Sequence, residues 1–369
     1  MVWNWQHKDW PNFIYNAVAL EQFEQNFIHK AGIMHGSMKH ISDDDKETLT
    51  VTLISDEALK TSEIEGELLN RDSLQSSIRK HFGLKTDNRR VSPAEHGISE
   101  MMVDLYKNAT SELTHKQLFK WHKMLTNGRR DLKNIGAYRS SGEPMQIVSG
   151  DVLDPIIHYE APPSENVPKE MDQFVSWFNA TGQGCAQELP ALTRAGIAHI
   201  KFESIHPFED GNGRIGRAIS EKALSQSLGR PTLIAVAQVI EQKRKAYYAA
   251  LQSGSKGLDI NEWLHYFCNM VLSAQDHTQN MIDFLIEKGK FYKRFDGKFN
   301  DRQAKVIERI FREGADGFKG GLSAENYITI TGAARATATR DLQNLVELGA
   351  LIKTGELRYT RYYLKIEAR

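Results

Sequence analysis

Apolar and polar positions follow the period of an α-helix through most of this chain. One apolar face runs through residues 42–70, at Leu49, Leu53, Ala58, Ile64 and Leu68. Ser42 can cap the start of this helix, and three aspartates follow it, where acidic side chains favour the positive end of the helix dipole. The pattern therefore predicts a helix from about residue 42 to about residue 70.

Similar periodicity predicts further helices at residues 13–29, 96–105, 115–125, 169–179, 192–202, 217–228, 243–251 and 261–284. Residues 135–163 differ, because glycines and prolines punctuate them. Within this stretch, Met145-Gln146-Ile147-Val148 is a short run of β-prone residues. We therefore predict a small β-hairpin in an otherwise helical chain.

The pattern changes again near residue 290. Helical segments are predicted at 301–311, 323–328 and 336–348, with a glycine-rich connector at 314–321 and strand-like segments at 351–353 and 359–364. This is the order of elements in a winged-helix domain. The predicted fold is mainly α, with an N-terminal helical region at 1–110, a helical core that carries the hairpin at 111–285, and a winged helix-turn-helix domain at 290–369.

Composition narrows the classes of partner. Lys and Arg together number 47, as do Asp and Glu, so no overall charge attracts the chain to nucleic acid or to a membrane. No apolar run is long enough to span a bilayer, and residues 1–6 lack the pattern of a signal peptide. Cys185 and Cys268 are too few for a disulfide framework and lack metal-ligand neighbours in the sequence. We therefore expect a cytoplasmic protein.

The most informative stretch is His206-Pro207-Phe208-Glu209-Asp210-Gly211-Asn212-Gly213-Arg214-Ile215-Gly216-Arg217. Gly211 and Gly213 flank Asn212 in a loop that runs into a predicted helix. Glycines allow successive backbone N–H groups to face inward, and a helix N-terminus adds partial positive charge, so the loop can bind an anion. Arg214 and Arg217 share one helical face, and arginine is suited to binding phosphate through two hydrogen bonds.

Two further residues of this loop indicate the chemistry. Asp210 is a hard oxygen ligand of the kind that holds Mg²⁺ together with substrate phosphates. His206 is the side chain best able to take a proton near neutral pH. Each residue alone is more often structural or simply solvated, but their concentration in one loop predicts a polyphosphate, a magnesium ion and a general base.

The same stretch resembles the Fic motif, His-Pro-Phe-x-Asp/Glu-Gly-Asn-Gly-Arg-x-x-Arg, at every defined position. Gly136-Ala137-Tyr138-Arg139 and Ile147-Val148 resemble the lead-in and the strand of the flap on which Fic proteins dock their targets. The resemblance covers about residues 40–285. Residues 1–40 resemble an N-terminal module of some bacterial Fic proteins, and a winged helix is a common Fic appendage.

The resemblance implies an enzyme that uses ATP and Mg²⁺ to transfer AMP to a Ser, Thr or Tyr hydroxyl of a protein. His206 would deprotonate that hydroxyl, and Asp210 would hold the metal. The implied phosphate-binding residues are Gly211, Asn212 and Gly213 for the α- and β-phosphates, Arg214 for the β-phosphate and Arg217 for the γ-phosphate. The intact second glycine of the motif disfavours the phosphate-transferring variant of the family, whereas transfer of phosphocholine stays open.

Thr61-Ser62-Glu63-Ile64-Glu65-Gly66 resembles the inhibitory motif of regulated Fic proteins, Ser/Thr-x-x-x-Glu-Gly/Asn. Thr61 and Glu65 lie four residues apart and therefore on one helical face. Gly66 is expected to leave room for the close approach of a packing partner. The resemblance implies that Glu65 pairs with Arg217, which removes the partner of the γ-phosphate and inhibits the enzyme.

Other residues near these motifs carry weaker predictions. Tyr247 and Tyr248 lie where Fic proteins place a tyrosine beside adenine, and Tyr248 is the preferred candidate, because an aromatic ring can stack on a base. His199 is interpreted as structural. Glu63 and Glu67 are interpreted as ordinary surface residues of a charged helix.

The predicted winged helix has a weak electrostatic signal for DNA, so DNA binding and a protein-interaction or dimer-supporting role both stay open. From residue 295 onward the chain has 13 Lys and Arg against 10 Asp and Glu, and the presumed recognition helix carries Arg340 but also Asp341 and Glu347. The rival to the enzyme is a DNA-binding transcriptional regulator that uses the Fic domain as a nucleotide sensor. His206 favours the enzyme, because a sensor needs no base. Self-modification, a homodimer and removal of AMP stay open, and no membrane partner is expected.

Overall fold

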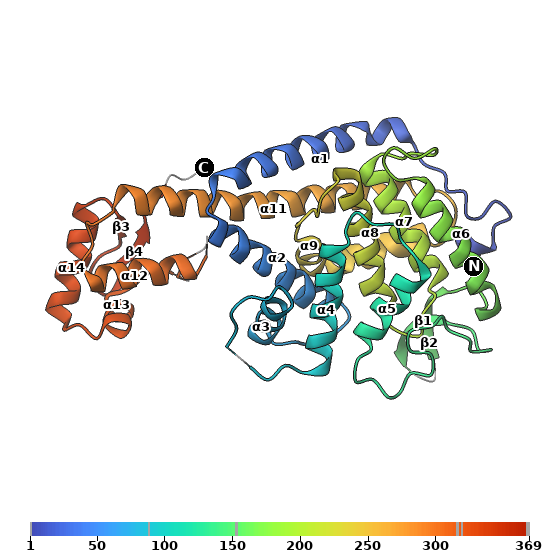
Figure 1. Ribbon diagram of the computed structural model, residues 1–369, viewed down its shortest axis with the longest axis horizontal. Helices are drawn as coiled ribbons and strands as arrows, with labels where there is room; N and C mark the ends of the chain where they lie inside the picture. The colour runs from blue at the N-terminus through green and yellow to red at the C-terminus, as the bar shows by residue number, and fades with distance from the viewer. Residues whose placement is uncertain (1, 88, 152–153, 315–316, 319, 367–369) are drawn as a thin grey trace. The chain divides into compact units, whose positions relative to one another are not determined.

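The computed structural model describes residues 2–87, 89–151, 154–314, 317–318 and 320–366, with the backbone alone at 149–151 and 154–155 (Figure 1). The chain is mainly helical, and its contacts group it into two units, Met1–Ile33 with Thr50–Thr278 and Met34–Leu49 with Gln279–Arg369. The three domains predicted from the sequence have different boundaries from these two units, and that division stays a prediction. Within the described ranges, no helix combines the length and apolar character needed to cross a membrane.

The helices of the described residues are α1 (Ala17–Ser37), α2 (Asp43–Ile64), α3 (Arg71–His81), α4 (Pro93–Lys107), α5 (His115–Leu125), α6 (Val167–Ala180), α7 (Ala191–Ile205), α8 (Asn212–Leu228), α9 (Val236–Gln242), α10 (Arg244–Gly254), α11 (Asn261–Arg294), α12 (Asp301–Arg312), α13 (Ala324–Thr331) and α14 (Arg335–Glu347). The strands are β1 (Gln146–Asp151), β2 (Asp154–Glu160), β3 (Leu351–Thr354) and β4 (Arg361–Leu364). They form two separate antiparallel hairpins, β1–β2 and β3–β4.

Helix α2 ends at Ile64, earlier than the predicted end near residue 70. Gly66 adopts a φ of +83°, a left-handed conformation that stops the helix and turns the chain. Leu68, expected on the apolar face, is 85% exposed. Helix α3 follows at once, with the Asn70 side chain accepting a hydrogen bond from Ser73 N as its cap. The periodicity missed α3, because the helix is short and contains few apolar residues.

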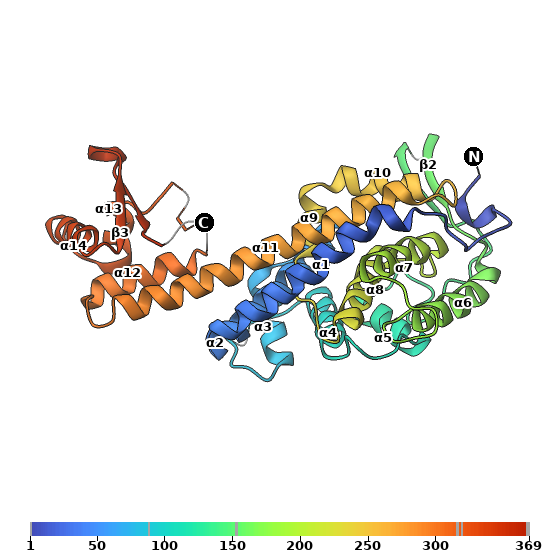
Figure 2. The ribbon, with the colours of Figure 1, turned by 90° about the horizontal axis from the view of Figure 1, so that it is seen from above.

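Helices α7 and α8 lie side by side in the first unit (Figures 1 and 2). Every residue of α7 except Glu203 is buried. The Glu24 carboxylate caps the N-terminus of α7 by accepting from the backbone N–H groups of Leu192 at 2.9 Å and Thr193 at 2.7 Å. A rigid buried helix therefore leads into the His206 loop, and α8 leads out of it.

The hairpin β1–β2 predicted from the sequence is present, and its base is fixed to α7. The Tyr159 hydroxyl on β2 donates to Ser204 O at 2.6 Å. Its ring packs edge to face on Trp3, with centroids 5.2 Å apart. Residues 152–153, within the segment predicted to carry the hairpin, lie outside the described residues.

In the second unit, α12, α13, α14, β3 and β4 surround an apolar core that includes Phe291, Val306, Ile310, Leu342 and Leu345. Asp341 is buried and accepts from Tyr327 Oη and Arg302 Nε, both at 2.8 Å, so this acid is structural and does not face a partner. The elements are consistent with the predicted order, but the winged-helix assignment stays a prediction. Residues 315, 316 and 319 of the predicted connector lie outside the described residues.

Candidate active site

His206 ends α7 in a backbone conformation that is rarely adopted. Its φ of 49° lies in the left-handed region, which is strained for a residue with a side chain. Arg139 holds this turn, because its backbone N–H donates to Pro207 O at 2.9 Å and its Nε donates to His206 O at 2.8 Å. Arg139 Nη1 also donates to Ser164 Oγ at 2.8 Å. From the sequence, Arg139 was expected only as part of the lead-in to the flap, whereas in the structure it holds the backbone of His206.

The loop after His206 is closed by Asn212, the first residue of α8. Its Oδ1 accepts from Phe208 N at 2.9 Å, and its Nδ2 donates to Phe208 O at 2.8 Å. The amide side chain is therefore committed to the loop. Gly211, with a φ of +83°, turns the chain into α8, whose first backbone N–H groups have no acceptor within the helix. These backbone groups, and not the Asn212 side chain, are available to an anion.

Arg217 on α8 is held by the end of α2. Its Nη2 donates to Glu65 Oε1 at 2.7 Å, and its Nε donates to Thr61 Oγ1 at 2.7 Å. The Arg217 side chain is 2% exposed and that of Glu65 is 29% exposed. Burial is the largest single influence and opposes the charged guanidinium, but Glu65, Tyr247 and Glu203 together outweigh it and raise the pKa of Arg217 above its usual value. The pairing predicted for these two residues is present.

The Glu65 carboxylate also lies against the first turn of α8. A Cβ added to Gly213 would overlap Glu65 Oε1 and lie 3.1 Å from Glu65 Cδ, so only glycine leaves space for the carboxylate here. Glu65 thus occupies the volume beside the anion-binding backbone. The packing role expected for Gly66 is wrong, because no described atom lies within 4 Å of a Cβ at that position. Its positive φ explains the glycine instead.

Arg214 pairs with a residue that the sequence interpretation set aside. Glu67 Oε2 accepts from Arg214 Nη1 at 2.7 Å, and the Arg214 side chain is only 7% exposed. The interpretation of Glu67 as an ordinary surface residue is therefore wrong. The sequence contained one signal for this pair, an acidic residue directly after Gly66. A turn at the glycine can direct that residue to the site where Glu65 already lies. Glu63, by contrast, pairs with Lys60 at 2.6 Å, within its own helix.

Asp210 lies at the edge of the loop. Its Oδ1 accepts from Gly211 N at 2.6 Å, and its Oδ2 accepts from Arg129 Nη1 at 2.5 Å. Burial would raise the pKa of Asp210, but Arg214 and Arg129 outweigh it and hold that pKa below its usual value. The described residues contain no cluster of three or more His, Cys, Asp or Glu suited to a metal. A single ionised carboxylate beside a phosphate site fits Mg²⁺ that takes its other ligands from phosphates and water.

The His206 ring is shielded from solvent, with a side chain 13% exposed. Burial, followed by the charge of Arg139, lowers the pKa of His206 to about 4. The imidazole is therefore uncharged at neutral pH and able to accept a proton.

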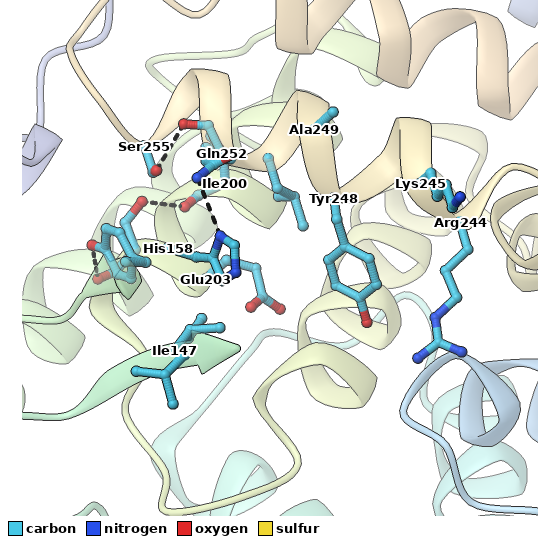
Figure 3. A pocket seen from close by; sticks show the side chains of 14 residues that line it. Ile147, His158, Ile200, Glu203, Arg244, Lys245, Tyr248, Ala249, Gln252 and Ser255 are labelled. Carbon is cyan, nitrogen blue, oxygen red and sulfur yellow. Dashed lines mark hydrogen bonds between the residues drawn. The ribbon is translucent and has the colours of Figure 1, made fainter. Parts of the chain in front are cut away.

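A cavity of about 660 Å³ opens between the hairpin, α7 and α10 (Figure 3). Ile147 and Val148 line it from β1, and Tyr248 lines it from α10. Tyr248 is 41% exposed and donates from its hydroxyl to Ile64 O at 3.3 Å. The volume and largely apolar lining suit a nucleoside. The structure thus brings the three residues predicted for adenine and for the flap to one cavity.

Tyr247 and His199 belong to the core beneath this cavity. Tyr247 is 1% exposed, and its hydroxyl lies 2.8 Å from His199 Nε2. The His199 ring packs on Trp263, with centroids 5.3 Å apart, and burial lowers the pKa of His199 to about 3. These contacts agree with the structural interpretation of His199, and they separate Tyr247 from its exposed neighbour Tyr248.

Sequence comparison assigns families to two parts of the chain. The Fic/DOC family matches residues 112–224, and a domain of unknown function (DUF4172) matches residues 3–84. Protein adenylyltransferase fic-1 of Caenorhabditis elegans is 30% identical over 153 residues, which are 40% of this chain and 27% of the relative. Protein adenylyltransferase Fic of Drosophila virilis is 31% identical over 106 residues, 29% of this chain and 20% of the relative. The matches thus span less than a third of either relative.

Solved structures agree with this assignment at the level of the fold. A Fic family protein from Desulfovibrio desulfuricans G20 aligns over 97% of this chain and 99% of its own, with a TM-score of 0.54 and 20% identity. A Fic domain containing signaling protein from Bacteroides thetaiotaomicron VPI-5482 aligns over 73% of this chain and 98% of its own, with a TM-score of 0.53 and 18% identity. His206, its loop and both arginines of α8 fall inside the matched segment, and residues 112–224 of this chain are a Fic/DOC family domain.

Proposed function

We propose that this protein is a protein adenylyltransferase, which transfers AMP from ATP to a Ser, Thr or Tyr hydroxyl of a protein. The observation that carries the proposal is an uncharged, clamped His206 beside the N-terminus of α8, whose Arg214 and Arg217 complete a site for phosphates. Relatives that match parts of the chain are named protein adenylyltransferases. Binding a nucleotide requires no base, so the histidine favours an enzyme over a sensor.

ATP would lie with its adenosine in the cavity lined by Ile147, Val148 and Tyr248. Its phosphates would extend to α8, where backbone N–H groups of the first turn bind the α- and β-phosphates. Arg214 would bind the β-phosphate and Arg217 the γ-phosphate. Mg²⁺ on Asp210 would neutralise charge on the phosphates.

In the reaction, His206 would take the proton of the target hydroxyl as its oxygen bonds to the α-phosphorus. The bond between the α-phosphorus and the oxygen bridging to the β-phosphate would break, and pyrophosphate would leave. Positioning by the loop and neutralisation of charge by the arginines would supply most of the rate.

In this structure a glutamate pairs with each of the two arginines, and we infer that this is an inhibited state. Glu65 holds Arg217, and Glu67 holds Arg214. ATP could then bind only without its proposed partners for the β- and γ-phosphates. A hydrogen bond to a charged group contributes about 1.5–3 kcal/mol, so loss of Glu65 should activate transfer by about 10- to 100-fold.

The test is incubation with ATP labelled at the α-phosphate, followed by measurement of label on protein. Glu65→Gly should label strongly, and wild type should label weakly. Glu63→Gly is the matched control, because it makes the same change near the same helix end without loss of an Arg217 contact. Glu65→Gly with His206→Ala should label no more than background.

The outcomes separate the alternatives. Equal labelling with and without His206 would contradict the proposed mechanism. ATP binding with no label in any variant would favour the nucleotide sensor. Weak wild-type labelling also has a second explanation, removal of AMP assisted by Glu65, which release of AMP from pre-labelled protein would reveal.

A further inference from the structure

Glu203 is the one residue of α7 that is only partly buried, with a side chain 14% exposed. Its carboxyl group lies between α8 and His206. A Cβ added to Gly216 of α8 would lie 2.5 Å from Glu203 Oε1, so the glycine makes room for the carboxyl group. Glu203 Oε2 lies 3.9 Å from His206 Nδ1. Figure 3 shows Glu203 extending from α7 toward the cavity proposed for adenosine.

Between α7 and α8, Glu203 Oε1 and His206 Nδ1 are both buried. Neither atom makes a hydrogen bond of good geometry with the described residues. The backbone of Glu203 also acts on His206 and raises its pKa, but burial and the charge of Arg139 each lower that pKa by more. An unpaired buried polar group costs about 1–3 kcal/mol. A small movement that brings the carboxyl group onto Nδ1 would satisfy the ring nitrogen.

We propose that Glu203 is a positioning residue for His206, whose carboxylate accepts the Nδ1–H and leaves Nε2 as the nitrogen that takes the proton. This inference rests on the proposed adenylyltransferase function. The hydroxyl proton moves to Nε2 as the hydroxyl oxygen bonds to the α-phosphorus, and pyrophosphate leaves. Nδ1 keeps its hydrogen, no proton passes to Glu203, and the carboxylate stabilises the resulting imidazolium.

The charged surroundings of Glu203 connect it to Glu65. Burial, followed by the charge of Glu65, raises the pKa of Glu203 to about 8, while Arg217 acts in the opposite direction. Glu203 therefore holds a proton in the inhibited state at neutral pH and cannot stabilise an imidazolium there. Removal of Glu65 takes away the second of the two causes and favours the carboxylate.

His158 also lines this cavity beside Glu203, whereas the other groups that face this corner do not titrate near neutral pH (Figure 3). The pKa of His206 is about 4, that of Asp210 is lowered, and that of Arg139 is about 10. The pKa values of Tyr159, Tyr247 and Arg217 are raised above their usual values. In a Glu65→Gly protein, a rise of kcat with pH between about 5 and 8 that is lost in Glu203→Gln would therefore report ionisation of the coupled Glu203 and His206 pair.

The experiment compares Glu65→Gly with Glu65→Gly carrying Glu203→Gln. The glutamine should lower kcat by about 10- to 100-fold, change KM for ATP by less than about 3-fold, and abolish the rise of kcat with pH. Glu95→Gln in the same background is the control, because Glu95 is a buried carboxylate that caps α4. It should leave kcat and the pH profile unchanged.

A second measurement does not depend on activity. The ¹⁵N spectrum of histidine-labelled protein reports which ring nitrogen carries hydrogen, and His206→Gln assigns the signals of the ring. At pH about 8, the protein with Glu203 should show hydrogen on Nδ1. Glu203→Gln should show a mixture of tautomers. An unchanged kcat and pH profile in Glu203→Gln, or hydrogen on Nε2 with Glu203 present, would overturn the proposal. An inactive Glu65→Gly protein would instead count against the adenylyltransferase function, and the spectrum would still decide the role of Glu203.

Discussion

Glu67 binds Arg214 at 2.7 Å, two residues beyond the Glu65 that binds Arg217 at the same distance. Gly66 lies between the two glutamates and, with its φ of +83°, ends α2 and turns the chain over the start of α8. One short turn therefore occupies both arginines proposed for the β- and γ-phosphates. Four substitutions test this arrangement and the loop beside it.

Glu67→Gln should activate transfer by itself and add to the effect of Glu65→Gly. The expected factor is about 2- to 5-fold, smaller than for Glu65, because the Glu67 side chain is 37% exposed and exposed ion pairs contribute little. Initial rates of protein labelling measure it. Glu63→Gln is the control, since Glu63 pairs with Lys60. A rate equal to wild type would show that Arg214 is not limited by Glu67.

Arg217→Ala should abolish most of the gain from Glu65→Gly. The freed guanidinium is the proposed agent of activation, because it becomes the partner of the γ-phosphate. Labelling rates of the single and double variants give the coupling between the two residues. A double variant as active as Glu65→Gly would mean that Glu65 inhibits by filling the space at Gly213, and not by holding Arg217.

Asp210→Ala should remove activity together with its dependence on Mg²⁺, tested in the Glu65→Gly background. The carboxylate is the metal ligand proposed at this edge of the loop, and its pKa is held below the usual value. Titration of Mg²⁺ against the labelling rate measures the effect. A variant with an ordinary Mg²⁺ titration curve would place the metal elsewhere.

Asn212→Ala should destabilise the protein by about 1–3 kcal/mol, because it leaves the N–H and C=O groups of Phe208 unpaired in the interior. Thermal unfolding of wild type and variant measures the loss. Asn12→Ala, at an exposed position, is the matched control and should change the melting temperature little. An unchanged melting temperature in Asn212→Ala would mean that water replaces the amide in the loop.

The loop could be located because its residues lie in one short contiguous pattern with specific chemistry. The Glu65–Arg217 pair was implied by the resemblance of residues 61–66 to an inhibitory motif. The sequence predicted most long helices, since their apolar faces repeat regularly. It missed α3 and α9, which are short, and it extended α2 beyond Gly66, where a single backbone angle ends the helix. Periodicity contains no information about that angle.

The supporting contacts of the site were harder to predict for a different reason. Arg139 reaches His206 across 67 positions of the chain, and Glu67 reaches Arg214 across 147. Nothing in local spacing indicates the first pairing, and the acidic residue directly after Gly66 is the only local signal for the second. Glu203 was missed because its role depends on the space left at Gly216, which only the packing of α7 on α8 defines.

The turn at Gly66 also determines how regulation can be coupled to the nucleotide. In the proposed binding mode, ATP and the turn compete for the same two arginines. ATP and a partner that captures the displaced turn would therefore each favour binding of the other. Thermodynamic linkage requires the two effects to be equal: the factor by which such a partner tightens ATP binding is the factor by which ATP tightens binding of the partner. A protein that captures residues 65–67 would therefore act as an activator without touching the nucleotide.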